Sequence, residues 1–223
     1  MDYYLEDNMS SFKTAAFAIL LGLPFLFSAC KSRGGQPYAT QKDNTWSANA
    51  CGAFSMAYYL AETGQIKGNQ VENTARQLYK EIKFDPQAGF GEYSDPFKIV
   101  KEITPYASSV RFGMNASNPQ TDGEKLMALL ATATGAYGMT EITDIASDLQ
   151  KDEYVIEILV PNPYVNLQNP MRNPLHYVLT YWKGDTLYTL DPGRGKEEPR
   201  QSFIDGTLKK WSFCNSGIFI KAK

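Results

Sequence analysis

The chain has 223 residues, of which 22 are basic and 24 acidic, and its formal net charge is −2. It contains no basic block and no alternation of basic and aromatic residues, so nothing in it points to a nucleic-acid partner. Hydrophobic residues make up 43% of the chain, enough for one ordinary domain with a sizeable core. A single histidine argues against an ordinary zinc site, no glycine-rich phosphate loop occurs, and we expect no cofactor.

Residues 1–29 have the layout of an export signal. Lys13 precedes the almost continuously apolar stretch 14–27, and Ser28-Ala29 supply small residues before Cys30. The stretch is shorter than the roughly 20 residues that a membrane-spanning helix needs. Its ending resembles a bacterial lipobox, which implies a lipid on Cys30, export, and anchoring to the cell envelope. A plain signal peptide or a buried helix are the alternatives, and Met9 is the expected start.

A polar tether is expected over residues 30–40, followed by one domain over residues 41–223. Periodicity and end signals predict helices first and strands later, which indicates an α+β domain with an antiparallel sheet. The predicted helices are 50–62, 69–83, 95–103, 124–132 and a short turn within 142–149. The predicted strands are 154–160, 176–182, 186–190 and 217–221, with an irregular loop over 161–174 that holds four prolines.

Cys51 begins a helix that is apolar on nearly every side and is therefore expected to be buried. Free N–H groups and the helix dipole at that position favour a thiolate, and the same N–H groups could hold an oxyanion. Gly52 is expected to leave open space beside the sulfur. A buried cysteine is more often a small hydrophobe, and in an oxidising compartment Cys51 could instead pair with Cys214 in a disulfide.

His176 is the sole histidine, so it is the one imidazole that could act as base to a thiol nucleophile. Asp191 ends the next predicted strand, and the turn between the two strands sets its position. If Gly184-Asp185 is a two-residue turn, Lys183 pairs with Thr186 and Asp191 is a diagonal neighbour of His176 on the same sheet face. A four-residue loop would place the two residues opposite each other, and a three-residue loop would separate them onto different faces. Structural roles for each residue alone remain the alternative.

Two groups of residues carry a family resemblance. The run 41–46, Gln-Lys-Asp-Asn-Thr-Trp, followed by 49–56, Asn-Ala-Cys-Gly-Ala-Phe-Ser-Met, resembles the opening of C39-like peptidases with a papain-like fold. The runs 175–179, Leu-His-Tyr-Val-Leu, and 190–193, Leu-Asp-Pro-Gly, resemble the end of the same domain. The likeness covers residues 38–221, but residues 65–150 match only in the order of elements. The family commonly has Pro-Ala-Ser after Cys-Gly, where this chain has Ala-Phe-Ser.

The resemblance implies a papain-like fold, in which a helical half packs on an antiparallel sheet, and a peptidase acting on a protein or peptide substrate. It implies Cys51 as nucleophile, His176 as base, Asp191 as the residue that orients the base, and Gln41 as an oxyanion donor. Asn44 and Asn49 are the alternative donors. A non-catalytic binding lipoprotein with the same fold, or a secreted toxin or effector, are the rival functions.

Overall fold

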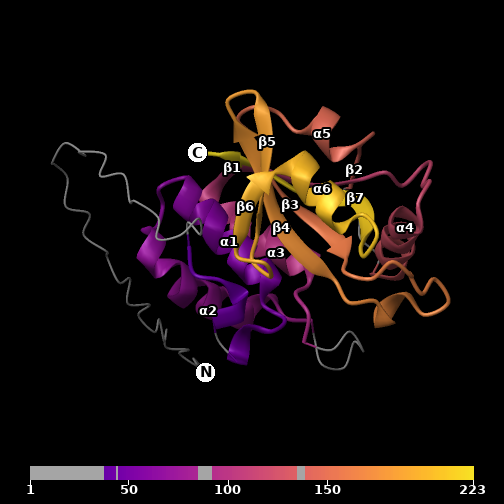
Figure 1. Ribbon diagram of the computed structural model, residues 1–223, viewed down its shortest axis with the longest axis horizontal. Coiled ribbons are helices and arrows are strands. Elements are labelled where there is room, and N and C mark those ends of the chain that lie inside the picture. Colours follow the sequence, from indigo (N-terminus) through magenta and orange to yellow (C-terminus); the bar gives the residue numbers. More distant parts are fainter. Residues whose placement is uncertain (1–37, 44, 85–91, 135–138) are drawn as a thin grey trace, which may run out of the picture. The chain divides into compact units, whose positions relative to one another are not determined.

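The computed structural model describes residues 38–43, 45–84, 92–134 and 139–223. Within them a seven-stranded sheet has the order β2-β1-β7-β3-β4-β5-β6 and helices lie on both of its faces (Figure 1). The fold is therefore the predicted α+β class. The helices are α1 (Cys51–Glu62), α2 (Val71–Ile82), α3 (Pro96–Ile103), α4 (Asp122–Thr134), α5 (Ile145–Asp148) and α6 (Arg200–Thr207). The strands are β1 (Ala107–Met114), β2 (Thr140–Glu141), β3 (Glu153–Val160), β4 (His176–Lys183), β5 (Thr186–Asp191), β6 (Lys196–Pro199) and β7 (Ser212–Ala222).

Side chains of the central strands alternate between two apolar layers, as the two-residue period of a strand requires. In β4, Tyr177 and Leu179 pack into the large cluster that also contains residues of α1, α2, α3 and α4. Val178 points the other way, into a smaller cluster with Phe203 of α6. A third cluster, which includes Ile145 of α5, covers the far part of that second face. Because both faces are covered, the central strands are buried almost throughout.

The sequence prediction placed every strand at or after residue 154, and this is wrong for β1 and β2. β1 lies between α3 and α4 in sequence and pairs antiparallel with β7, while the short β2 pairs parallel with β1. β1 escaped prediction because its first half is polar and only partly covered, so it has no apolar run. β6 and α6 were also missed, and Pro199 stands at their junction.

The β4–β5 hairpin has the two-residue turn on which the placement of Asp191 depended. Lys183 pairs with Thr186 and Leu179 with Leu190, so the register puts Asp191 across from Val178, beside His176. Gly184 adopts φ +61°, a left-handed conformation that glycine reaches without strain. Of the loop lengths considered, the two-residue turn is the one present, and it places His176 and Asp191 on the same sheet face.

The expected export signal, with Cys30 and most of the tether, lies outside the described residues. Within the described ranges, no helix is both long and apolar enough to cross a bilayer.

Candidate active site

Cys51 is the first residue of α1, at the helix end that meets the start of β4. Ten consecutive residues of α1 are buried, which confirms the predicted central helix. The residue before it, Ala50, has no side chain that caps the first N–H groups of the helix. The Sγ atom of Cys51 lies 3.8 Å from the carbonyl oxygen of Leu175, the residue that precedes His176. The sulfur therefore faces the strand that carries the histidine.

His176 and Asp191 form a buried hydrogen-bonded pair. The Nε2 atom of His176 lies 2.8 Å from Oδ1 of Asp191, and the two residues are 8% and 0% exposed. The His176 ring and the Cys51 side chain line one cavity, and a negative charge on Cys51 would raise the pKa of the imidazole. Because Nε2 is engaged by the carboxylate, the remaining ring nitrogen, Nδ1, is the one available to the sulfur. The structure thus places the His176 imidazole against the Asp191 carboxylate and beside the cavity that Cys51 also lines.

The charges around His176 favour its protonated form. Burial alone lowers the pKa of the imidazole, but the negative charge of Cys51, the hydrogen bond to Asp191 and the charge of Asp191 outweigh burial and raise the pKa to about 10. The His176 ring is therefore an imidazolium at neutral pH.

Two residues that the sequence prediction did not identify fix the imidazole in place. The ring of Trp211 packs edge-on against the His176 ring, with centroids 5.2 Å apart and an interplanar angle of 70°. The backbone N–H of Gly193 donates to Oδ1 of Asp191 at 2.8 Å. A Cβ atom on Gly193 would lie 2.9 Å from Cε1 of His176, so only glycine fits there without displacing the ring. The Asp-Pro-Gly run predicted a turn. In the structure this turn also borders the cavity, through Gly193.

Gln41 reaches the site from the segment that precedes α1. Its backbone N–H donates to the carbonyl of Pro192 at 3.1 Å, which ties this segment to the turn after Asp191. Its side-chain Nε2 donates to the carbonyl of Ala48. Because an amide nitrogen carries two hydrogens, one N–H remains for a ligand. Of the alternative donors, Asn49 lies in the same cavity and Asn44 lies outside the described residues.

A cavity of about 280 Å³, which we call the Cys51 cavity, joins these groups. Both ends of the loop between β3 and β4, Pro161 and Pro174, contribute to its wall. Its lining residues are Gln41, Ala48, Asn49, Cys51, Tyr93, Pro161, Pro174, Leu175, His176 and Gly193. The cavity brings three of the four predicted site residues to one surface, with Asp191 directly behind His176.

The expected space beside Gly52 is not there. A Cβ atom on Gly52 would lie 2.7 Å from Cβ of Ser94 and 2.8 Å from Cδ1 of Ile99. The glycine therefore permits close packing between α1 and the start of α3, and the room beside the sulfur lies on the side of Gln41 and His176 instead.

Cys51 and Cys214 are both buried free thiols, so they do not form the disulfide that was the alternative explanation for Cys51. Burial and the charge of Glu124 raise the pKa of Cys214 to about 12, which leaves it an unreactive thiol at neutral pH. Among the described residues, no cluster of histidine, cysteine and carboxylate side chains could hold a metal ion.

Comparisons with known proteins give one likeness in structure. No protein-family model and no curated protein sequence matches the chain. The crystal structure of the Pseudomonas avirulence protein AvrPphB aligns with 83% of this chain and 96% of its own, at 11% sequence identity and a TM-score of 0.42.

Proposed function

We propose that the chain is a thiol-dependent amide hydrolase, a papain-like cysteine peptidase of the C39-like kind. The observation that supports this most strongly is that Cys51 and His176 line one cavity while His176 is hydrogen-bonded to the buried Asp191. A thiol, an imidazole and a carboxylate grouped in this way supply the nucleophile, base and orienting acid of a cysteine hydrolase. The motif resemblance around the same residues supports the peptidase assignment.

In the proposed reaction, the Cys51 thiolate attacks the carbonyl carbon of a peptide bond and forms a C–S bond. The first N–H groups of α1 and the free N–H of Gln41 stabilise the oxyanion. The His176 imidazolium then gives its proton to the leaving amine as the C–N bond breaks. Neutral His176 next removes a proton from water, whose oxygen displaces the thiolate and releases the carboxylic acid. Asp191 holds the ring in one orientation through both steps.

The experiment that tests the proposal compares two cysteine variants. Cys51→Ala is expected to abolish hydrolysis of a quenched peptide library and labelling by a peptidyl vinyl sulfone, because the nucleophile is gone. Cys214→Ser is the matched control, since it removes the other buried thiol of the domain and should leave both signals. Hydrolysis that survives in Cys51→Ala would contradict the proposal.

We also propose that the enzyme is exported and held at the bacterial cell envelope through a lipid on Cys30, as the lipobox resemblance implies. Growth of the expressing bacterium with an alkyne fatty acid should label the wild-type protein and not Cys30→Ser. Equal labelling of the two proteins would contradict the anchor and leave the proposed chemistry untouched.

A further inference from the structure

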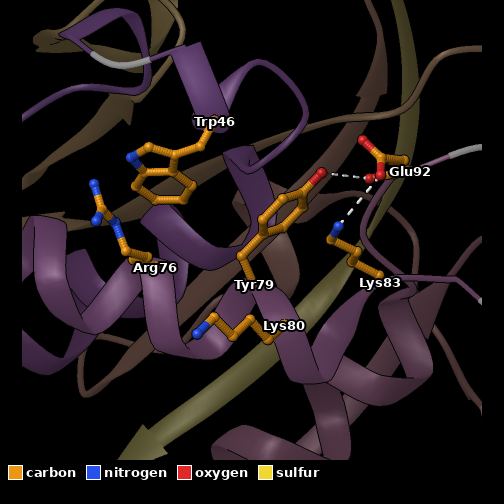
Figure 2. Close-up of a pocket in the computed structure, with 6 residues that line it drawn as sticks. All are labelled: Trp46, Arg76, Tyr79, Lys80, Lys83 and Glu92. Carbon is orange, nitrogen blue, oxygen red and sulfur yellow. Dashed lines mark hydrogen bonds and ion pairs between the residues drawn. The ribbon is translucent and has the colours of Figure 1, made fainter.

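A second and larger cavity, of about 450 Å³, lies on the exposed side of α2. Two aromatic rings, those of Trp46 and Tyr79, face it, and basic side chains surround them (Figure 2). We call it the basic cavity, and its lining residues are Trp46, Arg76, Tyr79, Lys80, Lys83 and Glu92. Residues 76, 79 and 80 are spaced as neighbours on one face of α2, and Lys83 follows one turn later.

Positive charge exceeds negative charge in this cavity. The Arg76 guanidinium lies over the Trp46 ring, 5.1 Å from its centroid, and its nearest carboxylate, that of Glu72, is 3.8 Å away. Lys83 lies over the Tyr79 ring and 3.4 Å from Glu92, the one acidic lining residue. No carboxylate of the described residues forms an ion pair with Lys80. Within the described ranges, Lys80 is therefore available to an anion that enters from solvent, and Arg76 has only the long ion pair with Glu72.

The basic cavity and the Cys51 cavity share two walls. The segment that leads into α1 gives Trp46 to the basic cavity and Ala48 and Asn49 to the Cys51 cavity. Across from it, Glu92 lines the basic cavity, and the next residue, Tyr93, lines the Cys51 cavity. A chain bound across Cys51 and along these two segments would bring a neighbouring side chain to the basic cavity.

Tyr79 connects the two cavities. Its hydroxyl donates to the backbone carbonyl of Glu92 at 2.8 Å, which fixes the shared wall against α2. Burial, with the charges of Glu92 and Cys51, raises the pKa of Tyr79 to about 12. The phenol therefore stays neutral at neutral pH and does not repel an anion beside it.

We infer that the basic cavity is a specificity site of the proposed peptidase, which selects a substrate with a glutamate or aspartate side chain next to the scissile bond. This inference rests on the proposed function and names its substrate class. The carboxylate pairs with Lys80 and Arg76, and the side-chain methylenes lie against Trp46. A glutamine of the same shape fits the cavity but lacks the charge, so the selection is electrostatic.

A quenched peptide library that varies every position around the cut tests this inference. The wild-type chain should prefer acid at one position near the cut, and a matched pair of peptides, with Glu or Gln there, then gives a ratio of kcat/KM values. We expect a ratio of about ten, and we expect Lys80→Glu and Arg76→Glu each to lower it about fivefold. Lys151→Glu is the control, because it makes the same charge change outside the lining of the basic cavity. The Lys151 side chain pairs with Asp185 of the β4–β5 turn.

The possible outcomes distinguish the specificity site from the proposed peptidase function. A ratio near one in the wild type, or a ratio that Lys80→Glu and Arg76→Glu leave unchanged, overturns the specificity site alone. An equal fall in the Lys151→Glu control also overturns it, because the effect is then one of net charge. A chain that cleaves no member of the library overturns the proposed function and the specificity site together.

Discussion

The Cys51 cavity and the basic cavity are neighbours, but they differ in how firmly their polar groups are held. In the first, the polar groups are buried and held by several contacts each, as His176 is by Asp191 and Trp211. In the second, the charged groups stand on long exposed side chains with few partners. Fixed groups suit bond-making, where a small displacement is costly, whereas exposed charges suit selection, where modest energies decide between substrates. Substitutions in the Cys51 cavity should therefore have larger effects on the rate than substitutions in the basic cavity.

The largest effect expected beyond the loss of Cys51 itself is that of Gln41→Ala. Removing one oxyanion donor should lower kcat by about 10²-fold. Asn49→Ala is the matched comparison, because Asn49 lines the same cavity and is the alternative donor. Steady-state kinetics with one library-derived peptide measures both. A larger loss in Asn49→Ala would transfer the oxyanion role to Asn49.

Asp191→Asn should shift the pH dependence of kcat/KM. This shift is more diagnostic of the role of Asp191 than the fall in rate is. Cys51 and Asp191 raise the pKa of His176 to about 10, so kcat/KM, which needs the imidazolium, should fall as pH rises through that value. An amide can still accept the His176 hydrogen bond but carries no charge, so the pKa falls and the alkaline limb moves to lower pH. We expect a loss of roughly tenfold at neutral pH. An alkaline limb that stays in place would show that Asp191 does not act on the ring.

Gly193→Ala tests whether activity depends on the position of the His176 ring, because the substitution displaces the ring without removing a polar group. The added methyl would press on Cε1 of His176, so we expect about a tenfold fall in kcat with little change in KM. Gly206→Ala in α6 is the matched control, because a Cβ there meets nothing within 4 Å. That control should keep full activity and gain stability by roughly 0.4–1 kcal/mol, read from thermal unfolding. Equal activity of the two variants would contradict the role given to Gly193.

The smallest expected effect is that of salt, and it sharpens the contrast between the cavities. Exposed charges are screened at about 0.5 M salt, whereas buried pairs are screened much less. The Glu-to-Gln ratio should therefore fall about twofold to threefold, while the rate for the Gln peptide stays nearly constant. If both peptides respond alike to salt, the preference does not come from the basic cavity.

Local signals in the sequence were sufficient for the central helix and for the β4–β5 hairpin. The apolar run after Cys51 predicted the buried helix, and a two-residue turn at Gly184-Asp185 was one of the loop lengths that would put Asp191 on the sheet face of His176. β1 could not be predicted, because its place depends on the distant β7 rather than on its own polar residues. Trp211 was missed for the same reason, since a lone tryptophan carries no sign of the partner that it covers.

Glycines were the residues that the sequence explained least. Gly52 was expected to leave space and instead permits contact with Ser94 and Ile99, while Gly193 was taken for a turn residue and also borders the imidazole. What a glycine permits is decided by the neighbours that approach it, and those come from other parts of the chain. The basic cavity was missed likewise, because Trp46 and α2 are separated by more than a helix in sequence.

The central claim, that His176 activates Cys51, is tested most directly by alkylation with iodoacetamide. The rate is followed by peptide mass mapping of Cys51 from pH 5 to pH 10, in the wild type and in His176→Ala. We predict that wild-type Cys51 reacts readily at about pH 6, because a nearby imidazolium stabilises the thiolate, and that His176→Ala reacts there at least about tenfold more slowly. Equal rates in the two proteins across this range would contradict the account.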